Sequence, residues 1–147
     1  MPANIHPTSI VDPAAGIADN VTIGPYCVVH GDVHIATGTV LESHVVVENG
    51  TRIGKNCTIS PGAVLGGSPQ DHKYRGERSL LVLGDNNIIR EYCTLHRAVG
   101  EGVATRLGND NMLMAYVHVA HDCHIGDHCI LANSVQLAGH VEIGEYA

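Results

Sequence analysis

An aliphatic residue recurs at every sixth position along almost the whole chain. The series starts at Ile5 and ends at Ile143, with breaks after Leu65 and Leu95. Its 21 members are all Ile, Val or Leu: Ile5, Val11, Ile17, Ile23, Val29, Ile35, Leu41, Val47, Ile53, Ile59, Leu65, Leu83, Ile89, Leu95, Leu107, Leu113, Val119, Ile125, Leu131, Leu137 and Ile143. Small or β-branched residues often stand four positions after these anchors, as at Val21 and Thr39. Such uniformity identifies an internal repeat whose unit is a hexad.

A period of six matches neither the 3.6-residue period of a helix nor the two-residue alternation of a single strand. It does match a coil of short flat segments joined by turns, in which each segment sends one anchor inward. Three hexads close a triangular turn, and stacked turns pair as parallel strands about 4.8 Å apart. The sequence therefore predicts one all-β domain over residues 1–147, a parallel β-helix of about seven triangular coils.

Two segments interrupt the series without changing its phase. One lies near 66–80 and the other near 97–106, and both are rich in glycine and charged residues. Because the anchors resume in register, we expect both segments to be loops that project outward from the coil. Long loops in a compact solenoid usually carry function.

Positive charge gathers around these two loops. The formal net charge is −7, which argues against a general nucleic-acid binder, yet six of the eight Lys and Arg residues lie between positions 73 and 106. This local excess suits a phosphate-bearing ligand or an acidic partner, although basic side chains that only solvate a loop produce the same pattern. No basic segment followed by an apolar run begins the chain, so we expect neither a signal peptide nor a membrane span.

The five cysteines all follow an anchor by four positions and are therefore expected to point inward. They are Cys27, Cys57, Cys93, Cys123 and Cys129. Small buried thiols filling a narrow core explain this placement. The odd count, the absence of a CxxC pair and the lack of a secretion signal indicate a reducing compartment. We expect a cytoplasmic protein.

Polar residues converge after Tyr116, where the chain reads VHVAHDCHIG. Gly139 stands three hexads after His121, which is one full coil, and His140 is its neighbour. These residues should share one outward patch, with His118 near the corner that leads to it. Asp122 could orient an imidazole there, provided that a turn brings the two adjacent side chains together.

Three interpretations of this patch remain open from spacing alone. An imidazole beside an exposed glycine N–H supplies a general base and an oxyanion donor, which suffice for acyl transfer without a covalent intermediate. Histidines that only decorate a repeat surface are the second. A metal site is the third, but His118 and His124 occupy equivalent positions in successive hexads and should lie on different faces. We therefore predict no metal.

Several longer motifs resemble those of the UDP-N-acetylglucosamine O-acyltransferase family. They are PQDHKYRGE at 69–77, IREYCTLHR at 89–97, NMLMAYVHVAHDCHIGDHCILAN at 111–133 and LAGHVEIG at 137–144. The resemblance covers nearly the whole chain. It implies a homotrimer of left-handed β-helices with active sites between subunits. It also implies transfer of an (R)-3-hydroxyacyl chain from acyl carrier protein to the 3-hydroxyl of UDP-N-acetylglucosamine, the first step of lipid A biosynthesis, with no cofactor beyond the carrier-protein thioester.

The same resemblance assigns roles to individual residues. His121 is implied as the general base, Asp122 as its partner and Gly139 as the oxyanion donor. Substrate-binding roles are implied for Gln70, Asp71, Lys73, His96, His118 and His140.

Two departures from the family pattern qualify these expectations. RAVGEG follows His96 where the family pattern reads RGT, so the second loop should differ in detail. The sequence also stops at Ala147, before the further coils and the C-terminal helical domain of the family. We therefore expect a truncated fragment with little or no turnover. A non-catalytic trimeric scaffold, or a sibling transferase using an amine acceptor or acetyl-CoA, are the alternatives.

Overall fold

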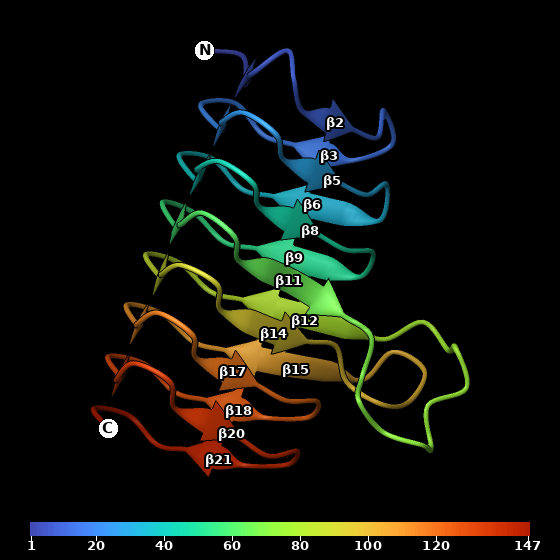
Figure 1. Cartoon of the computed structure of the whole chain (residues 1–147), viewed down its shortest axis with the longest axis vertical. Helices are drawn as coiled ribbons and strands as arrows, with labels where there is room; N and C mark the ends of the chain where they lie inside the picture. The colour runs from blue at the N-terminus through green and yellow to red at the C-terminus, as the bar shows by residue number, and fades with distance from the viewer.

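Short parallel strands stack in register along the whole chain. The computed structural model describes residues 1–147 and contains 21 strands and no helix. Each strand holds one of the 21 anchors, so the predicted hexads and the observed strands coincide. The chain is a left-handed parallel β-helix of the hexapeptide-repeat class, as predicted. Its two ends lie at opposite ends of the stack (Figure 1).

The strands form three seven-stranded sheets, one for each face of the coil. The first sheet contains β1 (Asn4–Ile5), β4 (Thr22–Ile23), β7 (Val40–Leu41), β10 (Thr58–Ile59), β13 (Ile88–Ile89), β16 (Met112–Leu113) and β19 (Ile130–Leu131). The second contains β2 (Ile10–Val11), β5 (Val28–Val29), β8 (Val46–Val47), β11 (Val64–Gly67), β14 (Thr94–His96), β17 (His118–Val119) and β20 (Gln136–Leu137). The third contains β3 (Gly16–Ile17), β6 (Val33–Ile35), β9 (Thr51–Ile53), β12 (Leu80–Leu83), β15 (Ala104–Leu107), β18 (His124–Ile125) and β21 (Glu142–Ile143).

The core runs as one continuous column inside the three sheets. Anchors in the middle coils are almost fully buried, for example Leu65, Leu95 and Leu113 at 0% exposure. All five cysteines are buried and unpaired, which confirms their predicted inward placement. The anchors of the end coils are only partly covered because they have a neighbouring coil on one side alone, as at Ile143.

Both interruptions are loops that leave the coil and return in register. Strand partners are three hexads apart in sequence where no loop intervenes, as with Thr22 and Val40. The separation rises to five hexads across the first loop (Thr58 with Ile88) and to four across the second (Ile88 with Met112). The first loop thus adds two hexads to its coil and the second adds one, which preserves the phase of the repeat.

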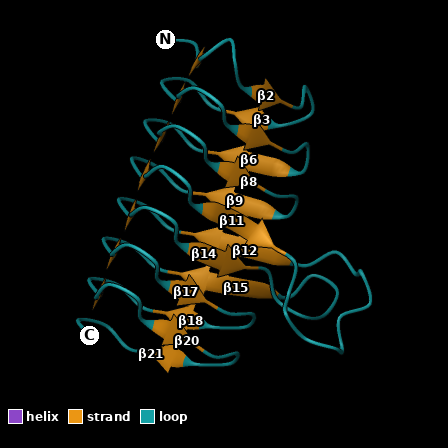
Figure 2. Ribbon diagram, in the orientation of Figure 1, coloured by secondary structure: helices purple, strands orange, loops and turns teal.

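The two loops are somewhat shorter than their predicted bounds of 66–80 and 97–106. Residues 68–79 and 97–103 lie between strands, because the segments at the loop bases pair with neighbouring coils. Figures 1 and 2 show both loops projecting from the same side of the stack. The structure has no helix with the length and hydrophobicity needed to cross a membrane.

Candidate active site

His121 and Asp122 occupy the turn between β17 and β18, directly beside the loops. Asp122 has a positive φ of 62°, and this turn lets two sequence neighbours face the same side instead of opposite sides. His121 Nδ1 lies 2.9 Å from Asp122 Oδ2, and the two side chains are 13% and 10% exposed. The sequence predicted that Asp122 could orient an imidazole only if a turn brought the two side chains together, and the structure contains both the turn and the pair.

Two further groups hold the Asp122 carboxylate and its backbone. The Val99 N–H donates to Asp122 Oδ2 at 3.1 Å, and the Asp122 N–H donates to Thr105 Oγ1 at 2.9 Å. Thr105 is completely buried. Sequence reasoning missed both residues. Thr105 could have been noticed as a hydroxyl at an inward position where the repeat usually places an apolar side chain, whereas nothing in the sequence points to Val99.

Gly139 and His140 lie against His121 from the next coil, as the three-hexad spacing predicted. A Cβ built on Gly139 would stand 2.5 Å from both Cε1 and Nε2 of His121, so only glycine leaves room for this imidazole. The Gly139 N–H donates to no acceptor within the chain. The His140 ring meets the His121 ring edge-on at 5.2 Å, and its Nε2 lies 3.8 Å from Asp122 Oδ2. A base and a free backbone donor are thus adjacent.

The first loop brings Asp71 to the other side of His121. Asp71 Oδ2 lies 3.6 Å from His121 Nε2, and its Oδ1 accepts a hydrogen bond from the Lys73 N–H at 2.8 Å. That backbone hydrogen bond is the main cause of a lowered pKa of the Asp71 carboxyl, and the charge of nearby Lys73 acts in the same direction. The side chains of Gln70 and Lys73 are exposed on the same loop and form no ion pair or hydrogen bond.

His96 and His118 form a second pair on β14 and β17. Their rings meet edge-on at 4.8 Å, and His118 Nδ1 lies 2.7 Å from Thr94 Oγ1. Burial lowers the pKa of His96 to about 4, with a further contribution from His118, and burial also lowers the pKa of His118. Both imidazoles are therefore uncharged near neutral pH. His96 Nδ1 is buried and has no hydrogen-bond partner in the chain.

The cluster also contains possible metal ligands. One donor atom each from His121, Asp122 and His140 lie within 4.8 Å of one another, which is close enough for a shared ion. However, Asp122 Oδ2 already accepts from His121 and Val99, and the His140 side chain is 73% exposed. His118 and His124 lie on the second and third sheets and cannot share an ion, as expected. The absence of a metal stays a prediction.

The histidine cluster lies on a corner of the prism and not in a cavity. No cavity of the single chain is lined by His121, Asp122 or Gly139. The surface hollow with the largest volume lies over the third sheet near Arg106, His124 and Glu142. A substrate enclosed at the cluster would need a wall that one chain does not provide.

Known proteins resemble the chain in sequence and in fold. The model of the bacterial transferase hexapeptide family (six repeats) matches residues 14–49, 32–67 and 104–139. An acyl-[acyl-carrier-protein]–UDP-N-acetylglucosamine O-acyltransferase from Thermodesulfovibrio yellowstonii is 50% identical over 145 residues, covering 97% of this chain and 56% of the relative. The chain thus spans about half the length of that relative.

Solved structures give the same result. LpxA from Acinetobacter baumannii superposes with a TM-score of 0.94 at 51% identity, covering 97% of this chain and 55% of that protein. A UDP-N-acetylglucosamine acyltransferase from Campylobacter jejuni superposes with a TM-score of 0.90 at 37% identity, covering 97% of this chain and 56% of that protein.

Proposed function

The chain belongs to the bacterial transferase hexapeptide family, and from this premise we propose that it carries the catalytic half-site of an acyltransferase. The reaction is transfer of an (R)-3-hydroxyacyl chain from acyl carrier protein to the 3-hydroxyl of UDP-N-acetylglucosamine, which opens lipid A biosynthesis. The relatives named for this reaction support the substrates. The observation that carries the proposal is the packing of Gly139 directly against His121 Nε2.

The paired carboxylate prepares His121 to act as the base. When Nδ1–H donates a hydrogen bond to Asp122 Oδ2, Nε2 is left with a free lone pair on the side of Gly139 and Asp71. Nε2 removes the proton of the sugar hydroxyl while the hydroxyl oxygen attacks the thioester carbonyl. The imidazolium formed is stabilised by Asp122.

The free N–H of Gly139 is suited to the negative charge that develops next. The carbonyl oxygen becomes an oxyanion in the tetrahedral intermediate, and an unpartnered backbone donor on a rigid coil can bind it without reorganisation. Collapse of the intermediate breaks the carbon–sulfur bond, and the proton held by His121 passes to the leaving thiolate. No metal or organic cofactor enters these steps.

The remaining polar residues are assigned to substrate binding. We assign Asp71, Gln70 and Lys73 on the first loop to the nucleotide sugar, with Lys73 supplying a charge for its phosphates. Neutral His96 and His118 offer hydrogen bonds to uncharged groups or to the diphosphate. His140 lies at the exposed edge of the cluster, where the sugar or acyl chain would pass.

A homotrimer would supply the missing wall of the site. Aliphatic side chains line the outward face of the second sheet at Ile10, Val28, Val46 and Val64, and Ile10 is 71% exposed. His118 continues the same face at the active-site end. Packing a second copy on this sheet would bury the aliphatic stripe and enclose His121. We place the protein in the cytoplasm, where acyl carrier protein and reduced thiols occur together.

The test is a transfer assay with 3-hydroxyacyl carrier protein and UDP-N-acetylglucosamine on the full-length protein. We expect turnover that His121→Ala reduces by roughly two to four orders of magnitude, because general base catalysis contributes about that much. Unchanged turnover in His121→Ala would overturn the role of this residue. Transfer only to a 3-amino sugar would show that the proposed acceptor is wrong. Transfer only from acetyl-CoA would show that the proposed donor is wrong. A trimer by sedimentation that neither turns over nor binds the UDP-sugar would indicate a scaffold.

A further inference from the structure

The loop that carries Asp71 is tied to the coil by a polar network whose residues form no hydrogen bond or ion pair with His121 or Asp122. We infer that Tyr74 and Arg97 are positioning residues, which hold this loop so that Asp71 faces His121 and the nucleotide sugar finds its site already formed. The inference rests on the proposed function, because it assigns Asp71 to the sugar. It gives a role to two residues that lie within the family-like motifs but received no role from the resemblance.

Arg97 is the centre of the tie at the base of the loop. Its Nη1 donates to the Gly66 carbonyl at 2.6 Å and to the Asn49 carbonyl at 3.1 Å, while Nη2 donates to the Tyr74 hydroxyl at 2.9 Å. The guanidinium carbon lies 5.9 Å from the centre of the Tyr74 ring. One planar side chain therefore joins the turn after β8, the end of β11 and the middle of the first loop.

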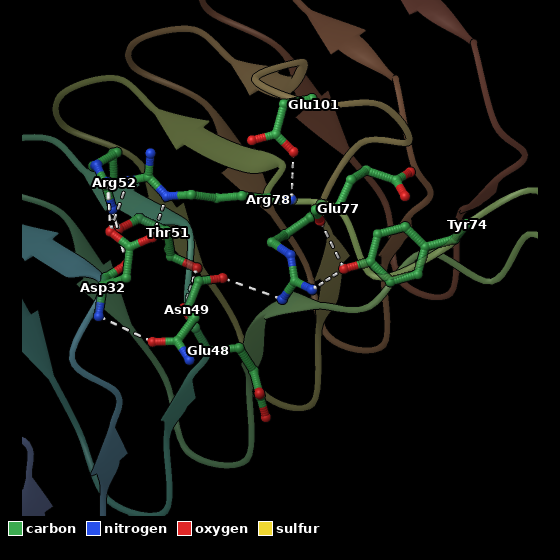
Figure 3. A network of polar contacts seen from close by, with 10 residues as sticks. Asp32, Glu48, Asn49, Thr51, Arg52, Tyr74, Glu77, Arg78 and Glu101 are labelled. Carbon is green, nitrogen blue, oxygen red and sulfur yellow. Dashed lines mark hydrogen bonds and ion pairs between the residues drawn. The ribbon is translucent and has the colours of Figure 1, made fainter.

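Tyr74 passes this restraint to Asp71. Its hydroxyl accepts from Arg97 and donates to the Glu77 carbonyl at 3.0 Å, and its N–H donates to the Asp71 carbonyl at 3.1 Å. Figure 3 shows Tyr74 at one side of the network and Asp32 and Arg52 at the other. Because the Tyr74 backbone is bonded directly to Asp71, moving its ring would move the turn that presents the Asp71 carboxylate.

The second loop and the third sheet hold the end of the first loop. Glu77 accepts from the Gly100 N–H at 3.0 Å, and the Arg78 N–H donates to Glu101 at 3.0 Å. Arg78 also pairs with Asp32 through two contacts of 3.0 and 3.2 Å. Arg78 and Arg52 lower the pKa of the Asp32 carboxyl to about 2, so this carboxylate stays charged at any ordinary pH. The loop is thus fixed at both of its ends.

The position of Arg97 links this tie to the active site itself. Arg97 directly follows His96 at the end of β14, and the Arg97 N–H donates to the Gly67 carbonyl at 2.9 Å. His96 packs against Gly67, where an added Cβ would stand 3.1 Å from the ring. One strand end therefore presents a site histidine on one residue and the loop restraint on the next.

Tyr74→Phe tests the inference because it removes one hydroxyl and keeps the ring. Tyr92→Phe is the matched control, since Tyr92 is an exposed tyrosine whose hydroxyl makes no hydrogen bond in the chain. In the full-length protein we expect Tyr74→Phe to raise the KM for UDP-N-acetylglucosamine about tenfold and to leave kcat within about twofold, because a lost hydrogen bond to a charged group costs roughly that factor. Arg97→Lys keeps the charge but cannot reach three acceptors, and should act in the same way.

Limited trypsin digestion supplies a readout that needs no activity. Lys73 and Arg75 are exposed on the loop, so release of the tie should speed cleavage after them while the coil stays intact and the melting temperature changes little. Faster cleavage in Tyr74→Phe but not in Tyr92→Phe supports the positioning role of Tyr74. This result would stand even if the wild-type protein did not bind the UDP-sugar, and only the proposed function would then be wrong. If cleavage and KM both match the wild type, the inference is wrong. If kcat falls while KM is unchanged, Tyr74 acts on chemistry and the positioning role is also wrong.

Discussion

His121 Nδ1 and Asp122 Oδ2 are 2.9 Å apart, although the two residues are neighbours in sequence. In an extended strand their side chains would point to opposite faces. The positive φ of Asp122 turns the chain at this point, and Thr105 and Val99 hold the turn from the neighbouring coil and loop. The geometry selects the tautomer of His121 that has its lone pair on Nε2.

Asp122→Asn should therefore damage catalysis without unfolding the protein. Asparagine also tolerates a positive φ, so the turn survives, but its amide no longer stabilises the imidazolium or enforces the tautomer. We expect kcat to fall by about a hundredfold or more. Asp110→Asn is the matched control, because Asp110 also has a positive φ and lies 3.9 Å from a histidine, His128, at another corner. An equal loss of activity in both variants would contradict a specific role for Asp122.

Gly139→Ala should lower turnover without lowering the stability of the fold. The new methyl group would meet His121 at 2.5 Å and must displace the imidazole that we propose as the base. We expect turnover to fall by at least about tenfold, since small misplacements of catalytic groups have effects of this size or larger. The melting temperature should stay close to that of the wild type.

Gly16→Ala is the control for this substitution. A Cβ on Gly16 would also meet a histidine ring of the next coil, at 3.0 Å, but that ring belongs to His34, which is exposed and distant from the histidine cluster. Both activity and melting temperature should match the wild type. A Gly139→Ala protein with full activity would show that the contact with His121 can relax at no cost, and would remove Gly139 from the mechanism.

The strands and the turns of the coil were predictable from sequence because the hexad repeat determines their positions. Every anchor lies in a strand, and the spacing of three hexads brought His121 and Gly139 together correctly. The loops were not predictable in the same way, since residues outside the register have no partner assigned by the period. The resemblance implied a substrate-binding role for Asp71 but not its approach to His121, and the contacts of Arg97 with Tyr74 had no sequence signal.

The five buried cysteines should be almost inert in the folded protein. Burial raises the pKa of the thiols of Cys27, Cys57, Cys93 and Cys123, which removes the reactive thiolate as well as access to it. We expect alkylation by iodoacetamide to be about a hundredfold slower or more than in urea. Mass spectrometry should then count five modified sites after unfolding. Rapid native labelling of any of them would contradict the continuous core.

His96, which is partly buried, should make the protein less stable as the pH falls below neutrality. Its pKa is about 4 when folded and near 6.5 when unfolded, so between these values the unfolded chain binds a proton that the folded chain does not. The free energy of unfolding should therefore decrease as the pH drops from about 6.5 toward 4. His96→Gln removes this proton uptake and should flatten the decrease, although His118, whose pKa burial also lowers, will leave part of it. Urea unfolding at several pH values measures the slope, with His34→Gln on the exposed face of β6 as the control. Parallel curves for wild type and His96→Gln would mean that His96 is protonated equally in both states, and would contradict its role as a neutral group in the site.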